Sequence, residues 1–163
     1  MAVSLLLILS FCGCAVKEAP AKECVSDQIE VVPEPSFYLT AALPQEATLT
    51  LTTDAGRRSV FSHEDYEITQ EVFLADSTDS ALKYLTGQDA ETLSPICLAE
   101  EPQAEYRFAW TAAGESGALN CTGALFFDGA YCYALSIQCA AEKEKLYRED
   151  FSALLSSVAL QAV

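Results

Sequence analysis

The chain has 163 residues, of which 51% are hydrophobic, and 24 acidic against nine basic side chains give it a formal charge of −15. A disordered acidic segment would be poor in apolar residues, so this composition indicates a folded chain. The length suits one domain with a hydrophobic core. Because the excess negative charge would repel a phosphate backbone, we expect no nucleic-acid partner.

The first 13 residues form an apolar leader. Ten of them are hydrophobic, and the first charged residue is Lys17. A run of this length is too short to span a bilayer and matches the apolar region of a signal peptide. The sequence therefore predicts a signal peptide over residues 1–13, with an upstream start codon supplying the basic residues that usually precede such a run.

The end of this leader, FCGC at residues 11–14, resembles the lipobox of bacterial lipoproteins. In that motif a small residue precedes the cysteine that receives diacylglycerol. Cys14 is therefore the predicted lipidation site, and Cys12, which follows bulky Phe11, is the second choice. Because two acyl chains anchor a protein stably, we expect a lipoprotein held at the cell membrane and facing outside the cytoplasm. The alternative is a buried N-terminal strand or helix with two core cysteines.

Residues 17–35 mix proline, acidic and small residues without a sustained apolar period, which is typical of a tether. We expect residues 14–35 to be the lipidated cysteine and an acidic tether, and residues 36–163 to form one globular domain. An anionic membrane surface would repel this acidic domain, so the lipid alone would anchor it.

The first half of the domain predicts short strands separated by turns. The β-rich runs lie at residues 37–43, 47–53, 58–61 and 66–74, with turns at Pro44-Gln45 and at residues 54–56. Ser77 or Asp79 offers an N-cap for a helix over residues 80–86 that ends at Gly87. Residues 93–103 contain two prolines and are predicted to be a loop.

The second half gives the strongest strand signal. Tyr106, Phe108 and Trp110 alternate with other residues as one aromatic face of a strand, and residues 114–117 form a turn. Runs at residues 118–127 and 130–138 are joined by Asp128-Gly129, which predicts a two-residue type I′ hairpin in which Phe127 faces Ala130. Both faces of the second run are apolar, so we expect this hairpin to be central and covered on both sides.

The C-terminal segment predicts an amphipathic helix that packs on the sheet. Its apolar residues recur at helical spacing, while charged residues occupy the other side. The apolar positions are Tyr147, Phe151, Leu154, Leu155 and Val158.

The order of these features resembles the PsbP-like family. A short helix over residues 81–87 precedes a long hairpin containing FFDGAY (126–131), and the chain closes with YREDF (147–151) and LLSSVAL (154–160). This ending is similar to the closing helix of proteins that include a photosystem II extrinsic subunit, a Ran-binding nuclear import factor and many small bacterial lipoproteins. The resemblance covers about residues 36–160 and implies an α+β fold, with a central antiparallel sheet and helices packed on its faces as an α/β/α sandwich. It also implies binding of protein partners without catalysis.

The single histidine, His63, limits the catalytic sites that the chain could hold. A Ser-His-acid triad, or most zinc sites with an imidazole ligand, would have to use it. Its place between two predicted strands favours an exposed turn instead. The paired acids at residues 64–65 and 100–101, and those at residues 76 and 79, are predicted to be solvated surface. We therefore expect no catalytic residue, no metal site and no cofactor.

Four cysteines lie in the predicted domain, at positions 97, 121, 132 and 139. The expected hairpin places Cys121 and Cys132 on one face but too far apart for a bridge, and directs Cys139 to the opposite face. Any disulfide would therefore involve Cys97, and its pairing stays open. Small buried thiols are the favoured interpretation.

These observations predict an extracytoplasmic lipoprotein that binds a protein or envelope component without catalysis. The alternative is an extracytoplasmic hydrolase that uses His63 with nearby acids. A third interpretation, a ligand-binding or sensing module, requires a concave apolar pocket.

Overall fold

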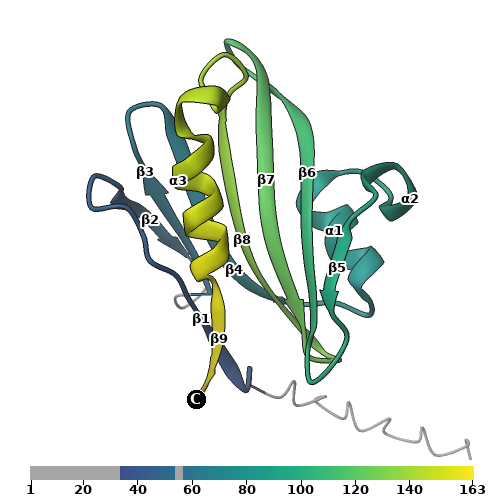
Figure 1. Cartoon of the computed structure of the whole chain (residues 1–163). Coiled ribbons are helices and arrows are strands. Elements are labelled where there is room, and N and C mark those ends of the chain that lie inside the picture. Colours follow the sequence, from purple (N-terminus) through teal and green to yellow (C-terminus); the bar gives the residue numbers. More distant parts are fainter. Residues whose placement is uncertain (1–33, 54–56) are drawn as a thin grey trace, which may run out of the picture. The chain divides into compact units, whose positions relative to one another are not determined.

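A seven-stranded antiparallel sheet forms the centre of the fold, which is α+β as predicted (Figure 1). The computed structural model describes residues 34–53 and 57–163. The strands lie in the order β2-β3-β4-β8-β7-β6-β5. Their bounds are β2 Thr48–Thr53, β3 Arg58–Ser62, β4 Tyr66–Leu74, β5 Ile96–Ala99, β6 Ala104–Gly114, β7 Gly117–Phe127 and β8 Tyr131–Ala140. The predicted leader, most of the predicted tether and the predicted turn at residues 54–56 lie outside the described residues.

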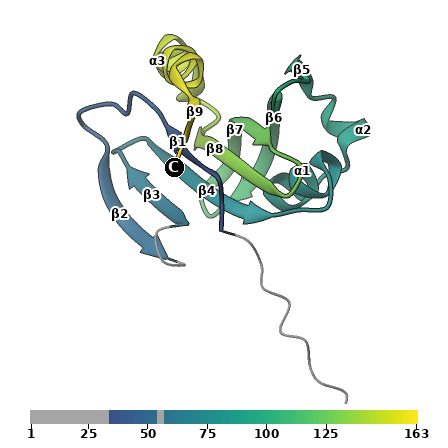
Figure 2. The same cartoon turned by 90° about the horizontal axis from the view of Figure 1, so that it is seen from below.

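Helices cover both faces of this sheet. The long helix α3 (Glu144–Ser157) lies across one face, and α1 (Thr78–Thr86) and α2 (Ala90–Leu93) lie against the other (Figures 1 and 2). The central strand β8 alternates between the two resulting cores. Tyr133 and Leu135 pack in the core that contains Phe151 of α3, whereas Cys132 packs in the core that contains Leu82 of α1. The prediction of a central hairpin covered on both sides is confirmed.

A second, two-stranded sheet joins the two ends of this unit. β1 (Phe37–Thr40) pairs with β9 (Ala159–Ala162) in antiparallel register, and the two strands lie side by side below α3 in Figure 1. Two expectations are corrected here: the first strand ends at Thr40 rather than at residue 43, and the closing helix does not reach residue 160. Val158 is extended and 7% exposed, so the helix ends at Ser157, and β branching favours the extended backbone with which the chain enters β9.

The β7–β8 turn has a different register from the predicted one. Phe127 pairs with Cys132, not with Ala130. The side chain of Asp128 is the reason: its Oδ1 accepts hydrogen bonds from the N–H groups of Ala130 and Tyr131, at 3.0 and 2.7 Å, and its N–H donates to the Tyr131 carbonyl. The central turn residues are therefore residues 129 and 130, of which the glycine has a φ of +101°. The shift is two residues, so each side chain keeps its predicted face.

The segment predicted as a loop at residues 93–103 contains the edge strand β5. Ile96 pairs with Arg107 of β6, and a bulge precedes Ala99. Pro95 and Pro102 stand just outside the strand, where a missing N–H costs no ladder hydrogen bond. The two prolines therefore flank β5 and do not prevent the strand from forming.

Of the two N-caps predicted for α1, Ser77 is the one used, so the helix begins at Thr78 instead of residue 80, and its predicted end at Gly87 is confirmed. Ser77 caps α1 by accepting a hydrogen bond from the N–H of Ser80, and Gly87 ends the helix with a φ of 72°. On α3, Phe151 and Leu154 are buried as the apolar spacing predicts. The sequence therefore identified α1, α3 and the face that α3 buries, but not the four-residue helix α2.

Candidate functional site

The predicted lipidation residues, Cys14 and Cys12, lie outside the described residues. Within residues 34–53 and 57–163, no helix has the length and apolar character to cross a membrane. Anchoring through Cys14 stays a prediction.

His63 lies in the turn between β3 and β4, where its N–H donates to the Tyr66 carbonyl at 2.9 Å. The imidazole is half-buried rather than exposed, because it stacks on the Tyr66 ring with 4.3 Å between centroids. Its Nδ1 accepts a hydrogen bond from the N–H of Asp65 at 3.2 Å. The neighbouring Ser62 hydroxyl contacts Thr50 and Glu67 instead of the imidazole. These contacts form a packed turn and not a serine–histidine pair.

The acid next to His63 is also engaged elsewhere. The carboxylate of Asp65 accepts a hydrogen bond from the Tyr147 hydroxyl at 2.6 Å. It also forms an ion pair with Lys143 Nζ at 2.9 Å. These two partners lower the pKa of Asp65, and Asp65 in turn raises the pKa of Tyr147 to about 12. The Asp65 side chain therefore positions the start of α3 and does not hydrogen-bond the imidazole.

The buried cysteines of the described residues are not activated as nucleophiles. All four in the described residues are free, and Cys121, Cys132 and Cys139 are buried as predicted. Burial raises the pKa of Cys121 to about 11 and that of Cys132 to about 12, so both stay protonated at neutral pH. Cys97 is exposed, contrary to the expectation of a buried thiol, because it lies on the edge strand β5. No group of three or more potential metal ligands occurs among the described residues.

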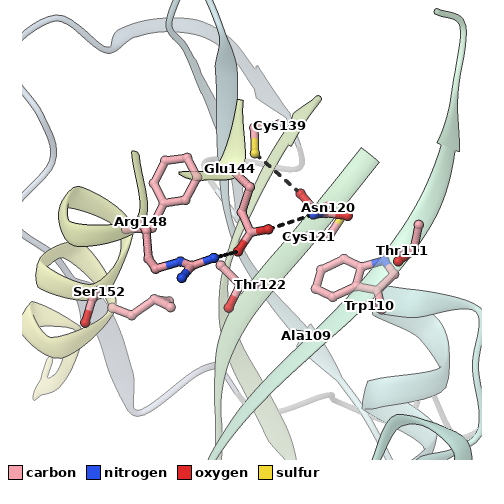
Figure 3. A pocket seen from close by; sticks show the side chains of 12 residues that line it. Ala109, Trp110, Thr111, Asn120, Cys121, Thr122, Cys139, Glu144, Arg148 and Ser152 are labelled. Carbon is pink, nitrogen blue, oxygen red and sulfur yellow. Dashed lines mark hydrogen bonds and ion pairs between the residues drawn. The ribbon is translucent and has the colours of Figure 1, made fainter. Parts of the chain in front are cut away.

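A groove of about 480 Å³ lies between α3 and strands β6 and β7, and we call it the α3–β7 groove (Figure 3). Phe151 and Leu155 of α3 contribute its apolar wall. On the sheet side, Ala109, Thr111 and Thr122 are small and leave the space open. The alternation of small residues on two paired strands thus produces a concave surface beneath a helix whose own side chains are larger.

A polar bridge crosses one end of this groove. Glu144, in the first turn of α3, accepts a hydrogen bond from Asn120 Nδ2 at 2.9 Å. It also forms an ion pair with Arg148 Nη2 at 3.4 Å (Figure 3). Near the other end of the helix, Arg107 Nη2 donates to the Leu155 carbonyl at 2.9 Å. The same carbonyl accepts a hydrogen bond from the Val158 N–H at 3.3 Å, so Arg107 adds a second bond that fixes the C-terminal turn of α3 over β6. The two ends of the groove are therefore held in place.

Sequence reasoning did not find the groove. The small residues of β6 and β7 carry no motif, and a groove exists only once α3 is placed over them. The one available signal was the alternation of Ala and Thr opposite an amphipathic helix, which also fits close helix–sheet packing. A concave surface with an apolar wall and a few fixed polar groups is typical of binding sites.

Comparison with known proteins gives structural matches only. No protein-family model matches the chain, and no curated protein does. Among solved structures, LpqN, involved in cell envelope biogenesis of Mycobacterium tuberculosis, superposes with a TM-score of 0.51 and 7% identity, over 77% of this chain and 84% of that one. The cyanobacterial PsbP (CyanoP) from Synechocystis sp. PCC 6803 superposes with a TM-score of 0.55 and 11% identity, over 80% of this chain and 96% of that one. The order of strands and helices and these superpositions agree with the resemblance read from residues 36–160: the protein has a PsbP-like fold.

Proposed function

We propose that this protein is an extracytoplasmic lipoprotein, anchored through Cys14, that binds a protein or another envelope component in the α3–β7 groove without catalysis. The observation that carries the binding role is the groove itself. Its volume of about 480 Å³ falls within the range of ligand pockets. Its apolar wall favours an apolar group, and Glu144 and Arg148 favour a polar group at the mouth.

The structural neighbours support the cellular setting. LpqN is involved in cell envelope biogenesis. The lipobox-like FCGC sequence at residues 11–14 would place this protein in the cell envelope as well. The turn that holds His63 favours the binding role over the alternative hydrolase, since its imidazole contacts a backbone amide and two tyrosine rings instead of a nucleophile.

The groove can be tested by filling it. Ala109→Phe adds a ring where small residues keep the groove open, and we expect about tenfold less partner recovered after crosslinking in intact cells. Ala113→Phe is the matched control, because Ala113 lies on the same strand and the same face but does not line the groove. Equal recovery of the partner with both variants would contradict the assignment of the groove.

The anchor has a separate test. Cys14→Ser should abolish labelling by a fatty-acid analogue and release the protein from membranes, whereas Cys12→Ser should leave both unchanged. Labelling that persists in Cys14→Ser and disappears in Cys12→Ser would move the site to Cys12. An unlabelled parent protein would refute the anchor without bearing on the groove.

A further inference from the structure

A second pocket, of about 560 Å³, lies against α3 and shares no lining residue with the α3–β7 groove. The segment between β1 and β2 contributes Pro44 and Glu46, and the β3–β4 turn contributes His63. On α3, Tyr147 and Asp150 face this pocket, while Glu144 and Arg148 face the groove. The pocket is therefore a separate site on the same helix.

Three rings form its aromatic wall. The ring of Tyr66 stacks on His63, with 4.3 Å between centroids, and meets Tyr147 edge-on at 5.1 Å. His63 and Tyr147 are also edge-on, at 5.6 Å. Each ring thus contacts the other two, and all three line the pocket. We call this set the aromatic cage.

The hydroxyl of Tyr66 is left without a partner. The side chain is 6% exposed, and its hydroxyl makes no hydrogen bond to any described residue, although a buried tyrosine hydroxyl usually finds one. No fully enclosed polar side-chain atom in the described residues lacks a partner, so this hydroxyl opens onto the pocket that Tyr66 lines. It is available to a ligand.

The charge of the pocket is negative. Glu46 and Asp150 line it, and no lysine or arginine among the described residues does. Because both carboxylates line the same pocket as Tyr66, their negative charge raises the pKa of this tyrosine beyond the rise that burial causes. Lys143, close by on the chain, is held by Asp65 at 2.9 Å. An anion would therefore be repelled, and an apolar ligand would leave the carboxylates uncompensated.

We propose that the aromatic cage binds an organic ammonium cation, carried either by a free small molecule or by a lysine side chain. Such a cation is attracted to the faces of aromatic rings, and Glu46 and Asp150 supply the opposite charge. A bare metal ion fits less well, since no group of three potential ligands occurs in the described residues. This inference does not depend on the function proposed for the groove.

The chain's single histidine provides the probe, because its imidazole Hε1 proton gives a unique NMR signal. Titration with choline should shift this signal saturably, with a Kd in the millimolar range. The neutral isostere 3,3-dimethylbutanol should produce no saturable shift. Equal shifts with the two compounds would overturn the proposal, because charge would then not be recognised.

A lysine peptide distinguishes the two sources of the cation. Trilysine that binds more tightly than choline would identify a lysine side chain as the ligand, and the reverse order would identify a small molecule. Acetylated trilysine controls for the peptide backbone. Absence of saturation with both cations would overturn the proposal.

Variants of the pocket residues test whether choline binds in this pocket. The double variant Glu46→Gln/Asp150→Asn should weaken choline binding by about tenfold. The control Asp76→Asn/Glu115→Gln makes the same change in net charge with exposed acids outside the pocket, and it should bind as the parent does. Tyr66→Phe removes only the unpaired hydroxyl and should weaken binding by about threefold. Equal binding by the two double variants would show that the protein's overall charge, and not the cage, holds the cation.

Discussion

The two sides of α3 carry pockets that differ in how their charges are paired. In the α3–β7 groove, Glu144 accepts a hydrogen bond from Asn120 and pairs with Arg148, whose positive charge compensates the carboxylate. In the pocket of the aromatic cage, Glu46 and Asp150 face a space that no lysine or arginine of the described residues lines. The first pocket is nearly neutral and the second is anionic, so one helix separates sites suited to ligands of different charge.

This difference follows from the spacing of residues on the helix. Positions 144, 148 and 155 recur at intervals of about one and two turns and line the groove, while positions 147, 150 and 154 line the pocket of the aromatic cage. Phe151 lies between the two rows and is buried. An amphipathic helix is usually described by one apolar and one polar side, but here the two borders between those sides have separate roles.

Removing the residue between the two rows should have the largest effect. Phe151 is 7% exposed, lines the groove and meets Tyr66 of the cage edge-on at 5.2 Å. Phe151→Ala should lower the free energy of unfolding by about 3 kcal/mol and impair both sites. Leu146→Ala on the same helix, where the side chain is 69% exposed, should change it by less than about 0.5 kcal/mol. Urea denaturation measures both; similar losses in the two variants would contradict this account.

A substitution on the opposite face of the sheet should affect stability alone. A Cβ atom at Gly123 would lie 2.7 Å from Cζ of Phe108, whose ring lies over the glycine on the α1 side. Gly123→Ala should therefore cost about 1–3 kcal/mol in unfolding free energy, because Phe108 must move. Partner binding and choline binding should both persist at temperatures where the variant is folded. Loss of either one in the folded variant would show that the two faces are coupled.

The smallest expected effect is a change in pH dependence at the edge of the cage. The Tyr147 hydroxyl and Lys143 hold the pKa of Asp65 below its ordinary value of 3.8. The resulting stabilisation is present above about pH 4 and is lost as the pH falls through the lowered pKa. Asp65→Asn should therefore show a shallower loss of stability in acid than the parent, as measured by urea midpoints at several pH values.

The same variant has an effect at high pH. Because Asp65 raises the pKa of Tyr147 to about 12, the tyrosine should titrate closer to 10 in Asp65→Asn, which NMR of the tyrosine rings would detect. Groove binding should not change. An unaltered Tyr147 titration would show that the 2.6 Å contact is absent in solution.

The sequence predicted those elements whose signals are local. The strand over residues 66–74 has the predicted bounds, and Ser77 and Gly87 mark the ends of α1, because capping chemistry acts over a few residues. The pairing of β1 with β9 could not be predicted in this way. These two strands of four residues lie at opposite ends of the domain's sequence, so no local signal indicates their pairing.

In the candidate sites too, contacts between residues close in sequence could be predicted, and contacts between distant residues could not. His63 and Tyr66 are three residues apart, so one could anticipate that they share a turn. Glu46 and Asp150 come from opposite ends of the domain, and topology alone brings both to that turn. The register error at residues 127–132 has a related cause, since the Asp128 carboxylate and not the turn dipeptide decided the pairing.

The β1–β9 sheet has a practical consequence for engineering. The N–H of Val163 donates to the carbonyl of Ser36 at 3.1 Å, so the two ends of the globular unit adjoin. A short linker could join them in a circular permutant, with new ends cut into the turn between β6 and β7 at residues 115–116. In such a molecule α3, β9 and β1 would be consecutive, and the antiparallel pairing of β9 with β1 would become a local hairpin.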